Sequence, residues 1–155
     1  FMREQAKTSL AEPHALHEGT PITQQSLSVI LPAYNEAQVI ASTVSTVHSV
    51  LDSWQVDFEL IVVNDGSTDQ TGAILAALAA SDPRMRFVTH PVNQGYGAAL
   101  VDGFAAATKE LTFFMDADGQ FDIRDLRTFS SVSNGESMNR AYAQRDRKRM
   151  RTPQH

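Results

Sequence analysis

The chain of 155 residues is 42% hydrophobic and contains no cysteine, so it can form one domain with a real core, and disulfide and thiolate chemistry are excluded. No apolar run approaches the roughly 18 residues of a membrane span. The formal charge is −5, but residues 140–155 carry a net of +5, so the rest is acidic, which argues against nucleic acid as a partner and fits a site that recruits cations.

The first part of the chain predicts an arm, a strand and a helix. Residues 1–26 are polar without a sustained hydrophobic period, so we expect a flexible arm. Residues 27–31 are predicted to form a buried strand that ends at Pro32. Asn35 is the expected N-cap of the following helix, with Gln38 at the reciprocal capping position. Apolar residues then recur at helical spacing at Ile40, Val44, Val47 and Leu51.

Strands and helices continue to alternate after this helix. We expect strands over residues 58–63, 85–89 and 111–115, a helix marked by Ile74, Leu75 and Leu78, and an alanine-rich helix over roughly 98–108. Ser67 and Gln70 repeat the capping pattern before the second helix. This order predicts an α/β fold with a parallel sheet and right-handed crossovers. No strand or amphipathic helix is indicated after about residue 129, so the predicted domain covers 27–129 and a polar, basic tail covers 130–155.

Polar residues gather where each predicted strand ends. In parallel sheets, ligands bind beyond the carboxyl ends of the strands, where the strand order reverses. The strand-end stretches are Pro32–Glu36, Asn64–Asp69, Asn93–Gly97 and Asp116–Gln120. We therefore expect all four stretches to contribute to one site.

Asp116 and Asp118 follow the fourth predicted strand directly. In an extended segment, residues two apart point to one side, so two like charges would repel each other there. A divalent cation removes this cost, and oxygen ligands suit Mg²⁺ or Mn²⁺. Gln120 is placed to complete the metal shell. The alternative is a solvated acidic turn, because Asp-x-Asp alone is a weak motif.

Three residues after the first two strands are candidates for binding a nucleoside. Asp65, at a strand end expected to lie where the strand order reverses, is placed to accept an N–H from a nucleobase, or to bond its own backbone as turn aspartates do. Tyr34 is placed to pack against a base. Glu36 is placed to bind ribose or base, although acids in a first helical turn also suit the helix dipole.

The remaining polar features give weaker signals. Residues 93–97 lack the spacing of a P-loop or a dinucleotide fingerprint, and their glycines either permit close approach to a ligand or serve a tight turn. His48 and His90 show no ligand spacing and are interpreted as surface residues. No Ser-His-acid arrangement is visible. The basic tail is interpreted as a solvated run, with an anionic membrane surface as an alternative contact.

Four ordered stretches together resemble family-2 glycosyltransferases, and most closely the branch of dolichol-phosphate mannosyltransferases and polyprenyl-phosphate glycosyltransferases. These stretches are Leu27–Glu36 (LSVILPAYNE), Ile61–Asp69 (IVVNDGSTD), Asn93–Ala99 (NQGYGAA) and Met115–Gln120 (MDADGQ). The resemblance covers about residues 27–129. Four motifs in this order are specific, whereas any one of them alone would not be.

The resemblance implies a GT-A, Rossmann-like fold and a UDP- or GDP-sugar donor. It places Pro32, Tyr34, Glu36 and Asp65 around the nucleoside. It makes Asp116 and Asp118 the catalytic acidic pair that meets ribose and the metal-bound diphosphate, with Gln120 assisting. Mg²⁺ or Mn²⁺ would stabilise the leaving diphosphate as a Lewis acid. A polyprenyl-phosphate acceptor is already an anion and needs no strong general base, and the expected location is cytoplasmic, with peripheral membrane contact.

The sequence departs from the family after residue 129. Family members continue with further strands and with basic residues that hold phosphates, so we expect a GT-A sheet truncated after its fourth strand. Two functions follow: transfer of a sugar to a polyprenyl phosphate, or a truncated module that binds donor and metal without transfer. A third is an α/β regulator whose acidic pocket binds metal alone. Turnover with a lipid phosphate would identify the transferase. Metal-dependent nucleotide binding without turnover would identify the truncated module, and metal binding indifferent to nucleotide would identify the regulator.

Overall fold

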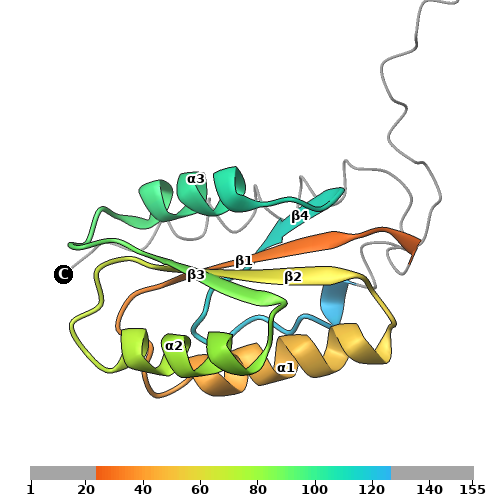
Figure 1. The fold of residues 1–155 in the computed structure, drawn as a ribbon, viewed down its shortest axis with the longest axis horizontal. Helices are drawn as coiled ribbons and strands as arrows, with labels where there is room; N and C mark the ends of the chain where they lie inside the picture. Colours follow the sequence, from red (N-terminus) through yellow and green to blue (C-terminus); the bar gives the residue numbers. More distant parts are fainter. Residues whose placement is uncertain (1–23, 127–155) are drawn as a thin grey trace, which may run out of the picture.

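The computed structural model describes residues 24–126, which form a parallel four-stranded sheet with helices on both faces (Figure 1). The elements are β1 (Leu27–Ala33), α1 (Ile40–Ser53), β2 (Phe58–Asn64), α2 (Thr71–Ser81), β3 (Met85–Thr89), α3 (Tyr96–Ala106) and β4 (Leu111–Phe114). The strand order is β3-β2-β1-β4, so the order reverses between β1 and β4. The predicted parallel α/β sheet is confirmed.

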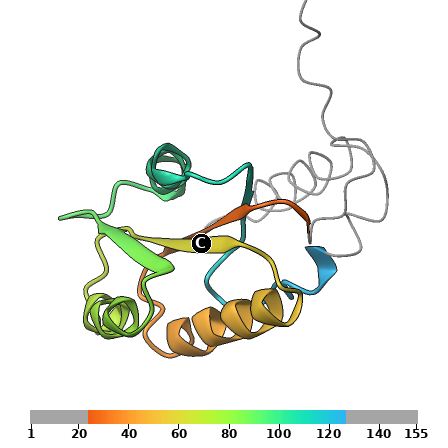
Figure 2. The ribbon, with the colours of Figure 1, turned by 45° about the vertical axis from the view of Figure 1, so that its right-hand side comes forward.

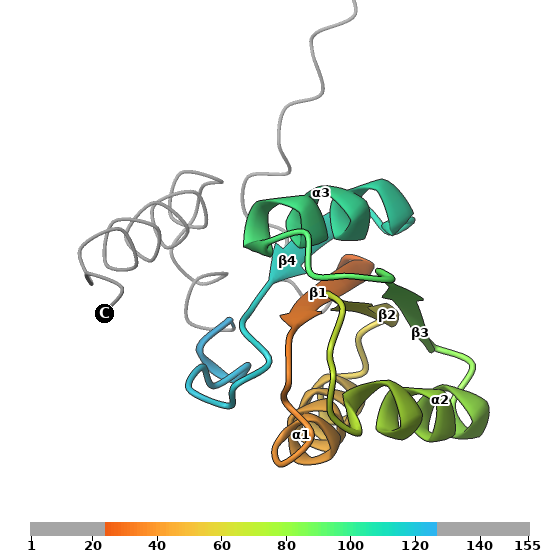
Figure 3. The same cartoon turned by 90° about the vertical axis from the view of Figure 1, so that its left-hand side faces the viewer.

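The sheet separates two apolar layers. Helices α1 and α2 cover one face and α3 covers the other (Figures 2 and 3). The predicted apolar positions of α1 are buried as expected, at Ile40, Val44, Val47 and Leu51. On the other face, Ala99 of α3 packs with Ile30 and Val63, and a Cβ atom on Gly103 would collide with the Ile30 side chain. Burial of each such Val, Leu or Ile side chain contributes about 1.5–3 kcal/mol.

Strand β1 does not end at Pro32, as the sequence predicted, but continues to Ala33. Pro32 is paired in register with Val63 of β2. The pairing of β1 with β4 stops at Ile30 and Phe114, so the missing N–H of Pro32 costs no ladder bond on that side. Proline is tolerated in a strand where a neighbour is lacking.

The predicted helix caps are wrong. Helix α1 begins after Val39 and α2 after Gln70, and neither of these residues makes a side-chain capping bond. Asn35 instead has a left-handed φ of 52°, and its backbone N–H donates to Ser67 Oγ at 3.0 Å. The caps fail because the Asn35 and Ser67 side chains accept backbone N–H groups from each other's loops instead of capping their own helices. Helix α3 also begins at Tyr96, earlier than expected.

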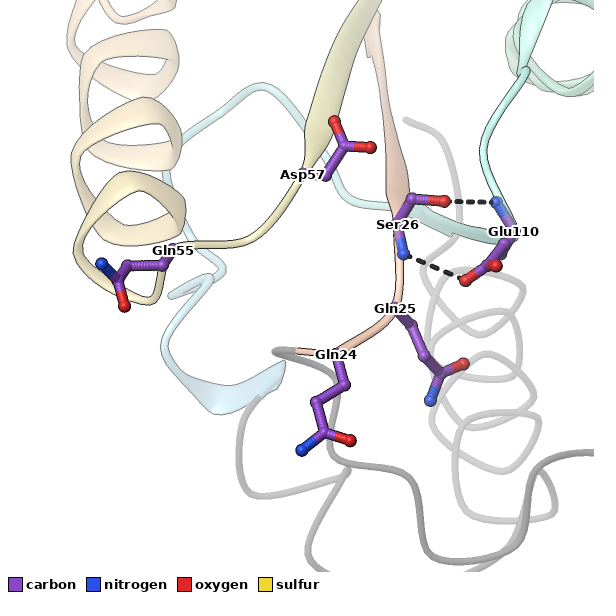
Figure 4. A pocket seen from close by; sticks show the side chains of 6 residues that line it. All are labelled: Gln24, Gln25, Ser26, Gln55, Asp57 and Glu110. Carbon is purple, nitrogen blue, oxygen red and sulfur yellow. Dashed lines mark hydrogen bonds between the residues drawn. The ribbon is translucent and has the colours of Figure 1, made fainter.

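An open polar pocket lies near the amino ends of the strands, opposite the predicted site (Figure 4). It is lined by Gln24, Gln25, Ser26, Gln55, Asp57 and Glu110. Ser26 N–H donates to Glu110 Oε2 at 3.2 Å, and Glu110 N–H donates to Ser26 Oγ at 3.0 Å. This pocket therefore contains none of the predicted site residues. Within residues 24–126, no helix is long and apolar enough to cross a bilayer.

Candidate functional site

The loops after β1 and β2 are joined by hydrogen bonds. Asn35 Oδ1 accepts N–H groups from Thr68 at 2.8 Å and Asp69 at 3.3 Å. Two further bonds run from Glu36 N–H to Thr71 Oγ1 at 2.9 Å and from Ala37 N–H to Asp69 Oδ2 at 3.2 Å. This pairing places Tyr34, which is 46% exposed, and the half-buried Glu36 beside the end of β2.

Asp65 joins the loop after β2 to the loop after β3. Its side chain is buried, and its two oxygens accept N–H groups from Gln94 at 2.8 Å and Gly95 at 3.0 Å. Burial alone would raise the pKa of Asp65, but the bonds from His90, Gln94 and Gly95 outweigh burial and lower it. The side chain thus holds a neighbouring loop, in contrast to a turn aspartate that bonds its own backbone.

Gly66 allows the same two loops to approach closely. Its φ is +70°, and a Cβ atom at this position would collide with the backbone of Val92 and Asn93. Glycine is the residue that accepts both a left-handed backbone and such an approach. In the loop after β3, Gly95 also has a positive φ, of 98°, which fits the turn reading of that motif.

His90 is buried, so its interpretation as a surface residue is wrong. Its Nδ1 lies 2.8 Å from Asp65 Oδ1, and its Nε2 lies 2.5 Å from Asp102 Oδ2 in α3. Metal-ligand spacing could not reveal this residue, because its partners are carboxylates distant in the sequence. The available signal was its position directly after β3, at the edge where the other polar residues gather. His48 is partly buried as well, with Nδ1 at 3.1 Å from Asp82.

Asp116 and Asp118 stand on either side of the buried Ala117, whose carbonyl accepts a bond from Thr43 of α1 at 3.2 Å. Both acids are half-buried. Residues 117 and 118 lie in a turn rather than in an extended segment, so a shared direction of the two carboxylates remains a prediction. The Tyr96 hydroxyl donates to Asp116 Oδ1 at 3.0 Å and so connects this segment to the start of α3.

The remaining candidate, Gln120, is exposed, and its backbone N–H donates to Asp118 Oδ1 at 3.0 Å. Two carboxylates and one amide are hard oxygen donors that suit Mg²⁺ or Mn²⁺. Within residues 24–126, no three His, Cys, Asp or Glu side chains form a group that could hold a metal. A cation at this pair would therefore need further ligands, such as Gln120, water or phosphate oxygens.

Negative charge accumulates at this edge of the sheet. Burial, and then Asp118, Asp69 and Asp116, raise the pKa of Glu36. The described residues contain four Lys or Arg side chains, and each pairs with a carboxylate. The pairs are Arg84 with Asp52 and Asp82, Arg86 with Glu59, Lys109 with Asp57, and Arg124 with Asp122. The described part of the chain thus offers this edge no unpaired basic side chain.

The structure brings the predicted site residues to one edge of the sheet, with one difference. The acidic pair follows β4, next to the reversal of strand order between β1 and β4. Asp65 follows β2 and is therefore one strand away from that reversal, contrary to expectation. Pro32 is buried near the end of β1. Hydrogen bonds connect the successive strand-end loops, so the residues belong to one connected region.

A sequence model described as glycosyl transferase family 2 matches residues 28–149. This match continues past residue 129, where we expected the resemblance to end, into residues outside the described range. It covers most of the chain, including every predicted site residue.

Individual relatives show the same likeness. The chain is 40% identical over 113 residues to glycosyltransferase AglD of Haloferax volcanii. The alignment covers 71% of this chain and 18% of that protein. It is 33% identical over 105 residues to dolichyl-phosphate beta-glucosyltransferase ALG5A of Trichomonas vaginalis, covering 64% of this chain and 32% of that protein. This chain thus spans about a third or less of the length of these relatives.

Solved structures share the fold. The mannosyltransferase PcManGT from Pyrobaculum calidifontis, in complex with GDP-Man and Mn²⁺, matches with a TM-score of 0.59 at 27% identity. The match covers 73% of this chain and 33% of that protein. The likeness therefore extends over most of this chain's sheet and helices.

Proposed function

The chain belongs to glycosyl transferase family 2, and from this membership we propose that it binds the nucleotide-sugar donor, with a divalent cation, for transfer to a polyprenyl phosphate. Its parallel sheet with helices on both faces is the GT-A arrangement that the resemblance implied. The GDP-Man and Mn²⁺ bound by PcManGT support a nucleotide-sugar donor and a metal. The dolichyl-phosphate specificity in the name of ALG5A supports the acceptor class.

The observation that carries the proposal is the connected set of strand-end loops. Tyr34, Glu36 and Asp65 come from the first two loops, which share hydrogen bonds, and with Pro32 they form the proposed nucleoside side. Asp65 Oδ2 accepts one N–H among the described residues, so it retains acceptor capacity for a base N–H. The exposed ring of Tyr34 is available to pack against the base.

The diphosphate is proposed to lie at the end of β4. Asp116 and Asp118, with Gln120, would hold the cation, which when bound supplies Lewis-acid stabilisation of the leaving diphosphate. The negative charge that raises the pKa of Glu36 would repel a diphosphate, and the four described basic residues already pair elsewhere. Nucleotide binding should therefore depend on the metal.

The acceptor is proposed to be anionic and held at a membrane. A polyprenyl phosphate supplies its own nucleophilic oxygen, so no residue of this chain is assigned as a general base. The basic residues within 140–155 are the proposed contact with an anionic membrane surface, which attracts clustered Lys and Arg. We therefore propose a cytoplasmic location with peripheral membrane contact.

A second candidate is a module that binds donor and metal without transfer. The pairing of all four described basic residues favours it, because transfer needs fixed cations around the leaving group as well as the metal. Multiple turnover with a lipid phosphate distinguishes the first candidate from the second. A regulator that binds metal alone would be indifferent to nucleotide.

The test is a calorimetric titration of the 155-residue chain with GDP and UDP, with and without MnCl₂. We expect binding of one nucleotide in preference to the other, and only when Mn²⁺ is present. Binding of Mn²⁺ that is unaffected by either nucleotide would favour the regulator. Absence of nucleotide binding under all conditions would contradict both donor-binding candidates.

A further inference from the structure

His90 lies between two carboxylates that come from different elements. Asp65, after β2, faces its Nδ1, and Asp102, in α3, faces its Nε2. The His90 side chain is 5% exposed, so water can replace neither partner easily. Its backbone N–H also donates to the Asn64 carbonyl at 2.9 Å. The ring thus connects the ends of β2 and β3 to α3.

This geometry requires a proton beyond those of a neutral imidazole. A neutral ring has one N–H and one lone pair, so it cannot donate to carboxylates on both sides. Asp65 accepts two backbone N–H bonds besides, and such bonds favour its ionised form. Asp102 has a side chain that is 46% exposed, so water still reaches its carboxylate. The additional proton therefore belongs on His90.

We propose that His90, as an imidazolium, is a positioning residue for donor recognition, which holds the Asp65 carboxylate and ties it to α3. The inference rests on the proposed role of Asp65 as the base contact. The same carboxylate holds the Gln94 and Gly95 amides, so the charge on His90 also fixes the loop that leads into α3. Loss of that charge should weaken nucleotide binding without direct contact between His90 and the nucleotide.

The direction of the pH effect follows from the partners. Hydrogen bonds with Asp65 and then Asp102 raise the pKa of His90 above its ordinary value of 6.5, although burial opposes them. Within the described residues, these two acids are the titratable groups acting on the ring. His90 therefore keeps its proton to a higher pH than an ordinary histidine. Nucleotide affinity should be retained below the raised pKa and lost as the pH rises through it.

The first measurement uses the parent chain alone. Nitrogen-15 NMR of the 155-residue protein would follow the His90 ring and the Gln94 and Gly95 amides from about pH 6 to about pH 8.5, which spans the histidine range. We expect both ring nitrogens to be protonated at the lower pH, and the two amides to shift with the ring. A neutral ring at the lower pH would overturn the proposal. So would Gln94 and Gly95 amide shifts that do not change as the ring titrates.

The second measurement is the affinity for GDP and UDP with Mn²⁺ over the same range. We expect a loss of about tenfold as His90 deprotonates, the scale of a hydrogen bond to a charged group. Asp102→Asn should move the midpoint of this loss to lower pH, because one carboxylate no longer holds the proton. A purely structural role would leave the midpoint where it is in the parent, and that result would overturn the proposal.

Two histidine variants separate this effect from other titrations. His90→Gln should bind nucleotide weakly. Its affinity should vary with pH only through ionisation of the nucleotide itself. His48→Gln is the matched control, since His48 is also partly buried beside a carboxylate, Asp82, but far from the strand-end loops. It should reproduce the parent profile. If it instead loses the pH dependence as His90→Gln does, the assignment to His90 is wrong.

Failure of the proposed function would be recognised separately. If no nucleotide binds at any pH, the donor-binding proposal fails and the recognition role of His90 fails with it. A common titration of the His90 ring and the Gln94 and Gly95 amides would then still establish that His90 holds Asp65. If the chain binds nucleotide with a pH-independent affinity, the donor-binding proposal stands and the inference about His90 is overturned.

Discussion

The acids at the carboxyl edge of the sheet are stabilised in two different ways. Asp65 is buried, and amides and His90 surround its carboxylate. Asp116 and Asp118 are half-buried and lie close enough to Glu36 to contribute, after burial, to its raised pKa. Hydrogen-bond donors stabilise the charge of an ionised carboxylate. Carboxylates that cluster without such donors repel one another, and a bound cation relieves this repulsion. The first environment suits recognition of a neutral base and the second suits a metal.

Replacement of Asp118 by Asn should weaken metal-dependent nucleotide binding by more than a factor of about ten, or about 1.4 kcal/mol. The variant keeps an oxygen for the Gln120 N–H and removes one charge from the proposed metal site. Calorimetry with GDP or UDP and Mn²⁺ measures the change. Asp122→Asn is the matched control, since Asp122 likewise accepts the N–H two residues on, from Arg124 at 2.9 Å. Equal affinities in the two folded variants would contradict the metal assignment.

Replacement of Asp65 by Asn should change the preference between GDP and UDP as well as lower the affinity. Removal of a charged acceptor from a buried N–H typically costs about 1.5–3 kcal/mol. If Asp65 only held the loop through Gln94 and Gly95, its replacement would weaken the binding of both nucleotides alike. The measured ratio of the two dissociation constants therefore decides between base recognition and loop support.

At the scale of the elements, the buried Glu59 carboxylate connects several elements near the amino ends of the strands, opposite the proposed site. Glu59 of β2 accepts bonds from Ser28 Oγ of β1 at 2.7 Å and from Thr108 N–H at 2.7 Å, and it pairs with Arg86 of β3 at 3.0 Å. The connection between α3 and β4 is thereby fixed to three strands. Burial would raise the pKa of Glu59, but the bonds from Ser28, Thr108 and Arg86 outweigh it and lower the pKa to about 2.

This shift predicts a specific dependence of stability on pH. A carboxyl group with a lowered pKa stabilises the fold fully above its unfolded value, 4.5, and this stabilisation is lost as the pH falls toward about 2. Glu59→Gln should cost about 2–3 kcal/mol of unfolding free energy at neutral pH. The substitution should also flatten the decline in unfolding free energy that the parent shows below pH 4.5, the unfolded pKa of Glu59. Urea denaturation across this range measures both effects.

The control for this prediction is Glu110→Gln. Glu110 is exposed and accepts the Ser26 N–H at 3.2 Å, so its loss should change stability by no more than about 0.5 kcal/mol. An equal loss in the two variants, or an unchanged acid decline in Glu59→Gln, would show that the buried network is not the cause.

At the scale of the whole molecule, charge is divided between the two ends of the strands. Arg84, Arg86 and Lys109 pair with carboxylates away from the strand-end loops. The acidic residues of the proposed site lie at the other end, where His90 pairs with Asp65. We therefore expect donor binding to depend on the metal, since the four described Lys and Arg side chains pair with carboxylates and a developing diphosphate needs cations.

We predict that the 155-residue chain binds donor nucleotide but sustains little or no sugar transfer. Catalysis requires an oriented acceptor as well as a donor, and the chain spans about a third or less of the relatives it resembles. The measurement is a radiolabelled-sugar assay with a short polyprenyl phosphate and Mn²⁺ at high protein concentration. Sustained multiple turnovers would refute the prediction and support the full transferase reading.

The sequence by itself determined the alternation of strands and helices and the edge at which the site lies. Hydrophobic periodicity is local, so the predicted strands fell within a residue or two of β1, β2, β3 and β4. In a parallel sheet every strand ends at the same edge. Residues directly after the strands, such as Glu36 and Asp116, therefore had to gather there whatever the strand order.

The tertiary structure alone decided the strand order, the caps and the burial of His90. The order β3-β2-β1-β4 puts the reversal beside Asp116 and not beside Asp65. Asn35 bonds Thr68 instead of its own helix, and Asp65 bonds Gln94, 29 residues away. A local pattern cannot encode these contacts, because each depends on which distant loop the fold places next to it.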